Sequence, residues 1–333
     1  MRLTDYISLR LCRLTWPEHA FANLPFVERL SIKTLNTDES VPSSGTTSFG
    51  LGLMLIAFLC FAIMDTSAKW LVMAAVPSLQ VAFVRYFVHF VWVLVLYLPT
   101  HGLRLAKSNR PWLQCVRALM LFSGTAFNFT ALKYLPLTTT VAIFFAAPMV
   151  VCLLSMVFLK ERVGVKRFTA IAVGFIGVLF IVQPWNDVFD IRILLAFGAL
   201  MGASGYFVMS RVVAGVDSNA VTQFYCAGVA TVLVLPVAIV HWQWPSSPVE
   251  WGLLLLIGSL GMLGHSVLTL AHQFAEASVL APTVYSQIVY ITFFSWLLFD
   301  SVPDRSTAFG IAIIIASGIY IWHRERQFGI HGR

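Results

Sequence analysis

The sequence has few charged residues for its length. Asp, Glu, Lys and Arg together make up 11% of its 333 residues, whereas hydrophobic residues make up 59%. Soluble domains contain about 25% charged and roughly 45–50% apolar residues. A chain with so little charge cannot bury all its apolar side chains in one soluble core. The composition therefore excludes a soluble protein and indicates an integral membrane protein.

The sequence also has few cysteines. All five are scattered along the chain and lie mostly within apolar runs: Cys12, Cys60, Cys115, Cys152 and Cys226. Neither a disulfide framework nor a metal-binding spacing is present. We therefore expect buried thiols, and we predict no cofactor and no metal.

A nucleotide-binding loop of the form Gly-x-x-x-x-Gly-Lys-Ser/Thr is missing as well. Any driving energy is therefore expected from a gradient of an ion or of a solute. The net charge of +7 is compatible with nucleic-acid binding, but the basic residues lie in short loops between apolar runs. This placement reflects membrane topology rather than a polyanion-binding face. The expected partner is the lipid bilayer, not nucleic acid.

Residues 1–48 differ in composition from the rest of the chain. They carry five basic residues and end in a Pro-Ser-Ser-Gly-Thr-Thr-Ser segment. Because they contain no continuous apolar stretch, they do not form an ordinary secretory signal. They are predicted to be a cytoplasmic tail, with an amphipathic surface helix as the alternative. Residues 324–333 are predicted to be a second cytoplasmic tail.

Apolar runs of about 20 residues predict helices that cross a membrane. Loop signals divide the chain into ten such runs, near residues 49–72, 79–98, 112–132, 136–159, 168–183, 191–211, 218–240, 251–272, 279–299 and 307–322. The sequence therefore predicts an all-α integral membrane protein with ten transmembrane helices.

Lys and Arg predict the orientation, since positively charged short loops stay cytoplasmic. With the N-terminus inside, sixteen basic residues fall on the inner side and three fall on the outer side. The three on the outer side are Lys133, Arg192 and Arg305. The sequence thus predicts a multi-pass protein of the bacterial inner membrane with both termini in the cytoplasm.

The two halves of the chain come into register when one is shifted by 140 residues, which places 155–162 over 295–302. Five spans in each half, 49–183 and 184–323, make the second half enter the membrane from the opposite side. The loops agree with this, because the basic loop 160–167 corresponds to 300–307, which holds two acidic residues and a single Arg. The pattern predicts two inverted five-helix repeats.

The run from Ala131 to Pro148, with Leu159-Lys-Glu-Arg162 and Gly174-Phe-Ile-Gly177, resembles the EamA repeat of the drug/metabolite transporter superfamily. Ala275 to Pro282, followed by Tyr285, resembles the same element in the second copy. One departure concerns the acidic residue Glu161 of the first copy. After the 140-residue shift its counterpart, Asp300, stands one position earlier in the second copy. The resemblance covers about residues 49–323.

This resemblance implies a secondary transporter of a small organic metabolite that works by alternating access. The segment from Met64 to Trp70, Arg85 with Tyr86, and the segment from Phe127 to Leu132 are most similar to bacterial members assigned to riboflavin uptake. Uptake of riboflavin or a similar flavin is the substrate this implies. Export of amino acids or related metabolites is the alternative.

A membrane-embedded enzyme or a sensor is the remaining alternative. An enzyme needs convergent catalytic groups, but His265, His272 and Glu276 form no recognised metal or nucleophile spacing. A sensor usually carries a folded output domain, and the N-terminal 48 residues are short and linker-like. We therefore expect no enzymatic activity.

Ionisable residues within a membrane are costly and are therefore candidates for function. Asp65 and Lys69 are spaced to share one face of the first helix, and so are Arg85 and His89 on the second. One hypothesis is an outer polar cluster that gates the pathway or binds the substrate, with Asp65 or His89 as a proton carrier. The other is a structural ion pair with Lys69 extending to the outer interface.

Other polar residues fall near mid-membrane. The pathway candidates among them are Asn128, Tyr225, Tyr285 and Gln287. Arg117 is expected to extend to the inner interface, and His265 to be a hydrogen-bonded bundle residue. Pro148 predicts a kink in the fourth span.

Overall fold

The computed structural model describes residues 44–158, 165–183, 190–213, 216–271, 274 and 280–331. The chain divides into two units, Met1–Val41 and Pro42–Arg333, and every described residue belongs to the second. The predicted tail therefore lies outside the described residues except for its last positions, 44–48, which are helical rather than linker.

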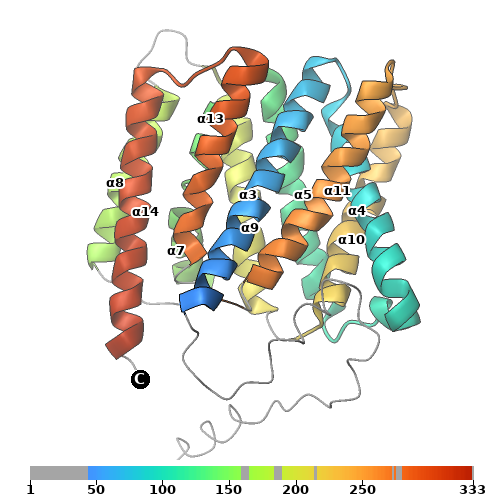
Figure 1. Cartoon of the computed structure of the whole chain (residues 1–333), viewed down its shortest axis with the longest axis horizontal. Helices are drawn as coiled ribbons and strands as arrows, with labels where there is room; N and C mark the ends of the chain where they lie inside the picture. Colours follow the sequence, from blue (N-terminus) through green and yellow to red (C-terminus); the bar gives the residue numbers. More distant parts are fainter. Residues whose placement is uncertain are drawn as a thin grey trace, which may run out of the picture. The chain divides into compact units, whose positions relative to one another are not determined.

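The regular structure in the described part of the chain is entirely helical, and its elements run side by side (Figure 1). They are α3 (Ser44–Met73), α4 (Ser78–His101), η2 (Gly102–Ala106), α5 (Pro111–Tyr134), α6 (Leu137–Phe144), α7 (Ala147–Phe158), α8 (Val165–Val182), α9 (Ile193–Val212), α10 (Asn219–Val240), α11 (Pro248–Ala271), η3 (Ala281–Tyr285), α13 (Ser286–Phe299) and α14 (Arg305–His331).

Each predicted span coincides with one of these helices or with a consecutive pair. Among the described residues, seven segments are long and apolar enough to cross a membrane. Shorter apolar helices, Ala172–Val182, Thr283–Phe299 and Arg305–Tyr320, occupy the fifth, ninth and tenth predicted spans. The predicted all-α membrane architecture is therefore confirmed. Below, the "near end" of the bundle is the end where α3 begins, and the "far end" is the end where α3 stops at Met73.

Proline and a left-handed residue set several helix boundaries. Pro77 and Pro136 precede α4 and α6, and Pro111 is the first residue of α5. Proline suits these places because its fixed φ matches a helix and its missing N–H is not needed in a first turn. Asp300, at a φ of 49°, ends α13 in the left-handed conformation.

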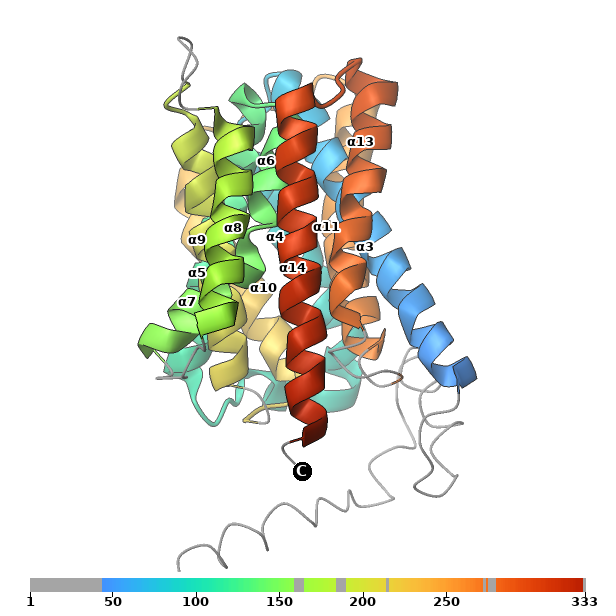
Figure 2. The ribbon, with the colours of Figure 1, turned by 90° about the vertical axis from the view of Figure 1, so that its left-hand side faces the viewer.

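The packing repeats itself with the 140-residue shift found in the sequence. α3 packs on α11, and α9 packs on α5, which is the same contact in the two copies. α4 packs on α10 and α8 on α14, so each of these helices meets its own equivalent, and Figures 1 and 2 both show α8 beside α14. The two halves are thus related as inverted repeats, as predicted.

The contact between α8 and α14 shows the relation residue by residue. A Cβ atom added at Gly177 would lie 2.8 Å from the carbonyl oxygen of Gly310. In the shifted copy, the hydroxyl of Ser317 donates to the carbonyl oxygen of Ala170. Small residues let the two backbones approach this closely.

The fourth helix of each repeat is interrupted at equivalent positions. α6 ends at Phe144 and α7 begins at Ala147, just before Pro148, so the expected kink takes the form of a short break. In the second repeat, η3 gives way to α13 after Tyr285. Phe145 and Tyr285, which are equivalent under the shift, pack edge to face with ring centroids 5.7 Å apart. The two breaks therefore meet.

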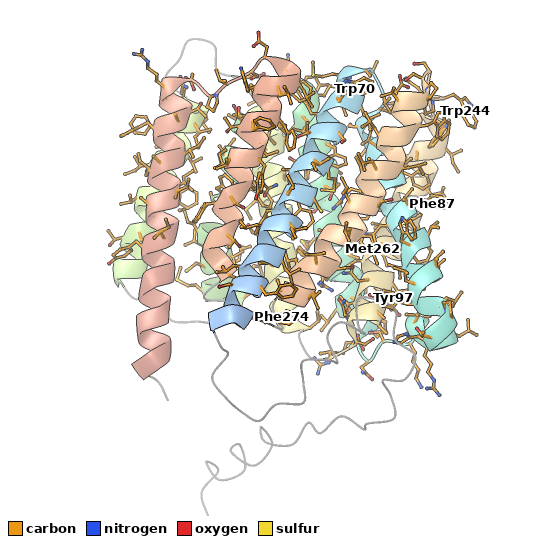
Figure 3. The ribbon with its side chains drawn as sticks, viewed as in Figure 1. Trp70, Phe87, Tyr97, Trp244, Met262 and Phe274 are labelled. Carbon is orange, nitrogen blue, oxygen red and sulfur yellow. The ribbon has the colours of Figure 1, made fainter. Side chains whose placement is uncertain are left out.

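The bundle exposes large apolar side chains on its outside. Trp112, Val240 and Trp244 are all at least 75% exposed. Figure 3 shows Trp70 and Trp244 toward the far end and Phe274 toward the near end. Aromatic residues near both ends of an apolar surface are typical of proteins whose flanks contact lipid.

Candidate functional site

Three of the predicted pathway residues meet around one carboxylate. The Asp65 carboxylate on α3 accepts hydrogen bonds from the Asn128 amide on α5, at 3.3 Å, and from the Gln287 amide on α13, at 3.4 Å. Asp65 is 8% exposed and Gln287 is 6% exposed. Both distances exceed the roughly 2.7–2.9 Å of strong charge-assisted bonds. The carboxylate is therefore buried, but loosely held, between residues of both repeats.

Lys69 does not pair with Asp65, so the predicted ion pair between them is wrong. Its ammonium group instead donates to the carbonyl oxygens of Leu132, at 2.6 Å, and Leu135, at 2.8 Å. These carbonyls lie at the end of α5, where the last turn has no helical donors left to satisfy them. The lysine stabilises this helix end, and it leaves Asp65 without a basic partner on its own helix.

Arg85 lies beside Asp65, Asn128 and Gln287, which we call the Asp65 cluster. Its Nη1 donates to the Thr125 hydroxyl at 2.7 Å, and its guanidinium stacks 4.7 Å from the centre of the Tyr86 ring. Arg85 is only 4% exposed. It is close enough to attract Asp65 electrostatically, yet within the described residues no ion pair or hydrogen bond joins the two. An acidic and a basic side chain are therefore both buried here without a direct bond between them.

His89 and His265 continue the polar group toward the near end. Their rings lie 6.2 Å apart at an interplanar angle of 23°. Gln223 bonds to His89, whereas the Nε2 atom of His89 is buried without a hydrogen-bond partner. Both rings are close enough to Arg85 to feel its charge. The predicted juxtaposition of Arg85 and His89 thus extends to a third residue, on α11.

Arg117 does not extend to the interface as predicted. It is 8% exposed and points into the bundle. There its Nη2 donates to the Tyr206 hydroxyl at 2.9 Å and its Nε donates to the Ser210 hydroxyl at 2.8 Å. These two hydroxyls on α9 supply the acceptors that make the inward conformation favourable.

The buried polar residues follow one face of α5. Gln114, Arg117, Thr125 and Asn128 are spaced by three, eight and three residues, which places them on one side of a helix. Their partners come in turn from the α9–α10 connection, α9, α4 and α3. This spacing was present in the sequence and was the signal by which Arg117 and Thr125 could have been found.

Two predicted pathway residues lie apart from this group. Tyr225 donates its hydroxyl to the carbonyl oxygen of Ala106 at 2.9 Å, in the connection that follows α4 at the near end. Tyr285 packs on Phe145, and its hydroxyl group abuts Gly318. In the described contacts neither tyrosine touches Asp65 or Arg85.

A hydrogen-bonded network closes the near end. The Asp217 carboxylate, between α9 and α10, accepts from the Ser108 hydroxyl at 2.6 Å, from the Asn109 backbone N–H at 2.9 Å and side chain at 3.2 Å, and from Gln114 at 2.9 Å. Partial burial opposes ionisation, but these bonds outweigh it and lower the pKa of Asp217 below its ordinary value. We call these four residues the near-end contact.

The far end carries the counterpart of this network. The Gln80 side chain at the start of α4 donates to the Gln243 carbonyl oxygen at 2.7 Å and accepts from the Gln243 N–H at 2.9 Å. We call this pair the far-end contact. A cavity of about 270 Å³ also opens at this end, and Lys69 and Ser295 are among the residues that line it.

Metal-ligating residues do not gather in the described part of the chain, where no three His, Cys, Asp or Glu side chains are placed to hold a metal ion. His272 and Glu276 lie outside the described residues. The polar group described above offers charged and hydrogen-bonding side chains.

Comparison with protein families identifies two matching segments. The model of the EamA-like transporter family matches residues 48–183 and again residues 191–322. A solved structure covers 83% of this chain and 96% of its own, with a TM-score of 0.55 and 18% sequence identity. At that identity the likeness speaks for the fold alone.

Several curated proteins are similar over most of their length. An S-adenosylmethionine uptake transporter of Rickettsia felis is 30% identical over 84% of this chain and 94% of its own. A riboflavin transporter of Vibrio cholerae is 30% identical over 82% and 93%. A pseudopaline exporter of Pseudomonas aeruginosa is 29% identical over 80% and 94%.

Proposed function

Because the chain belongs to the EamA-like transporter family, and is therefore a membrane transporter of small metabolites, we propose that it works by alternating access in the bacterial inner membrane. In this scheme the two repeats rock against each other around a bound solute, so that each end opens in turn. Both termini lie in the cytoplasm, which makes the near end the inner side. The driving force is a gradient of an ion or of the solute itself.

The observation that carries this proposal is the Asp65 cluster. A buried carboxylate in a membrane protein is costly unless it is paired or used. Among the described residues, its hydrogen bonds come from the amides of Asn128 and Gln287, one from each repeat. A solute bound at this place touches both repeats, and rocking of the repeats changes its access from one end to the other.

The near-end and far-end contacts support the same scheme. The far-end contact joins the start of α4 to the connection that follows α10. The near-end contact joins Asp217, just before α10, to the connection that follows α4. In the inverted repeats these are equivalent places at opposite ends. Opening one end requires that one contact break while the other holds.

Flavin uptake is the first substrate candidate. It rests on the resemblance of the first repeat to bacterial riboflavin transporters and on the riboflavin transporter among the similar proteins. The amides of Asn128 and Gln287 would bond the polar edge of the planar ring, and the aromatic rings of Tyr86 and Phe129 would flank it.

A metabolite with an amino-acid group is the second candidate, and a specific observation favours it. Asp65 is an acid and Arg85 a base, both are buried, and no bond joins them in the described contacts. Such a pair suits the ammonium and carboxylate groups of an amino acid, which would bind one charge each. S-adenosylmethionine has both of these groups. The same site would serve a transporter that takes such a solute up and one that exports amino acids or related metabolites.

Proton coupling would also act at Asp65. A proton on this carboxylate and a cationic solute group at the same place exclude each other, which is the exchange that a coupled transporter needs. His89 is the other candidate carrier, because its unpartnered Nε2 atom can accept a proton.

Counterflow in proteoliposomes tests the function and the site together. Proteoliposomes that contain the purified chain are loaded with unlabelled riboflavin or S-adenosylmethionine, and their uptake of the labelled compound is followed. Asp65→Asn is expected to reduce exchange at least about tenfold, because it removes the buried charge. Asp190→Asn, the same change at a partly exposed carboxylate paired with Arg192, is the matched control and is expected to exchange normally.

Growth of a riboflavin-requiring bacterium that lacks its own transporter separates the substrates. Rescue at low external riboflavin supports flavin uptake. No rescue, despite confirmed membrane expression, together with exchange of S-adenosylmethionine, supports the amino-acid-bearing class. Methionine is tested in the same counterflow assay as a smaller amino acid. If riboflavin, S-adenosylmethionine and methionine all fail to exchange, the transport proposal fails for these substrates. Full exchange by Asp65→Asn refutes the site.

A further inference from the structure

A second buried arginine, Arg117, lies closer to the near end of the bundle than the Asp65 cluster does. Arg117 is on α5, eight residues before Thr125, which binds Arg85. At about 1.5 Å per residue, this separates Arg117 from Thr125 by roughly 12 Å along the helix, toward the near end. Both positions belong to the polar face of α5. The two guanidinium groups therefore lie at different depths along the same face of α5.

The surroundings of the two arginines are closely alike. The Arg85 guanidinium stacks on Tyr86 at 4.7 Å and that of Arg117 on Tyr206 at 4.8 Å. Each donates to at least one aliphatic hydroxyl, at 2.7 Å and 2.8 Å. Among the described residues, neither forms an ion pair with a carboxylate.

Arg117 is the less compensated of the two. Arg85 has Asp65 within electrostatic reach, whereas Arg117 has only neutral partners in the described contacts. Its Nη1 atom is buried without any hydrogen-bond partner. A buried cation with unused donors is strongly unfavourable in a bundle of apolar helices. An anion that binds there would relieve both the charge and the unsatisfied donor.

Two residues connect the arginines. Cys226 on α10 is 2% exposed and lies within electrostatic reach of Tyr86, Tyr206 and Arg117. His265 lies within reach of both Arg85 and Arg117. Cys226 and His265 are thus each within electrostatic reach of both arginine–tyrosine pairs.

We propose that Arg85 and Arg117 are two successive binding stations for one anionic group of the solute, a carboxylate. The group binds Arg85 when the solute enters at the Asp65 cluster and moves along α5 to Arg117 before release at the near end. The inference rests on the proposed transport function for the order of these steps. The anion site at Arg117 itself stands on the contacts above.

Cys226 provides a probe of this site that does not require a known substrate. The chain is prepared with Cys226 as its only cysteine, by replacing Cys12, Cys60, Cys115 and Cys152. Its rates of modification by an anionic methanethiosulfonate reagent (sulfonatoethyl) and a cationic one (trimethylammonioethyl) are then compared. Arg117→Gln is expected to lower the anion-to-cation rate ratio at least about tenfold, since it removes one buried positive charge beside the thiol.

Two matched variants separate charge from structure. Arg117→Lys keeps the charge and is expected to keep most of the ratio. Arg104→Gln makes the same change at an exposed arginine of η2 and is expected to keep all of it. If the Arg117→Gln ratio equals that of the parent, the anion site is refuted. If neither reagent reaches Cys226 in the parent, the region is sealed and the proposal is likewise overturned.

A competition experiment covers the case in which Arg117→Gln does not fold. In the single-cysteine parent, acetate is expected to slow the anionic reagent at least twofold more than acetamide does at equal ionic strength. Equal rates in acetate and acetamide would contradict a carboxylate site. These readouts do not measure transport. Failure of counterflow with an intact charge preference at Cys226 would therefore refute the transport proposal and leave the anion site standing.

Discussion

Asp217→Ala should open the near end of the bundle. The Asp217 carboxylate is the common acceptor of the near-end contact and receives hydrogen bonds from Ser108, Asn109 and Gln114. Alanine removes all of them and leaves the donors to bond with water. Alternating access then shifts toward the state with an open near end, because only that state has already lost these bonds.

The size of the shift follows from the bonds. Four hydrogen bonds of 2.6 to 3.2 Å end on the carboxylate of Asp217. Hydrogen bonds to charged groups contribute about 1.5–3 kcal/mol each when buried, but Asp217 is largely solvated, so about 0.5 kcal/mol each is the appropriate scale. Their total is about 2 kcal/mol, or about thirtyfold in the equilibrium between the two states.

Modification of Cys226 by neutral methyl methanethiosulfonate measures the opening, in a chain whose only cysteine is Cys226. Asp217→Ala is expected to raise the rate by up to about thirtyfold, the limit reached when the open state is rare. Gln80→Ala breaks the far-end contact and is expected to slow the reaction or leave it unchanged. Asp190→Asn lies in neither contact, so it serves as the control and is expected to leave the modification rate unchanged.

Two results would refute this reasoning. One is an Asp217→Ala rate within twofold of the parent. The other is a steep change, between pH 5 and 8, in the ratio of the Asp217→Ala rate to the parent rate; the ratio is used because ionisation of the Cys226 thiol changes both rates alike. The pKa of Asp217 lies below its ordinary value, so its contribution is fully present above the ordinary pKa of about 3.9 and is lost only as pH falls through the folded value. The near-end contact should therefore be insensitive to pH in the physiological range.

Two further predictions concern stability. Gly177→Val should lower the melting temperature by several degrees, because its side chain would clash with α14 at a cost of about 1–3 kcal/mol; Gly252→Val, where a Cβ atom meets nothing within 4 Å, should change it little. Lys69→Met should also lower the melting temperature, because it leaves two carbonyls at the end of α5 without their charged donor, and Lys69→Arg should restore part of the loss. An unchanged melting temperature for Gly177→Val or Lys69→Met would contradict the corresponding contact.

The membrane spans and the inverted repeat could be predicted because they depend on properties that the sequence records directly. The length of an apolar run sets a span, and the charge of a loop sets its side. The meeting of Asp65 with Gln287 could not be predicted in the same way, since the two are 222 residues apart. Each was a reasonable candidate by depth, but their contact depends on how α3 and α13 pack.

Arg117 shows why depth alone misled the prediction. It lies within the first two turns of α5, so extension to the interface was the simplest expectation. The face of the helix decides instead, because Arg117 shares its side of α5 with Thr125 and Asn128. Once that side points inward, the hydroxyls of α9 make the inward conformation favourable. Helix periodicity should therefore be weighed together with depth for any membrane arginine.

In the proposed site, the two repeats contribute polar side chains unequally. The positions of α11 equivalent to Gln114, Arg117, Thr125 and Asn128 are Leu254, Ile257, His265 and Leu268, and all but His265 are apolar. Leu254 and Ile257 are fully buried. An inverted repeat supplies the symmetric motion, but the polar groups come mainly from its first copy. A solute that fits such a bundle is itself two-sided, with charged or hydrogen-bonding groups against α5 and an apolar side toward the second repeat. This requirement is met by an amino-acid group attached to a larger ring system, and less well by a small, fully charged metabolite.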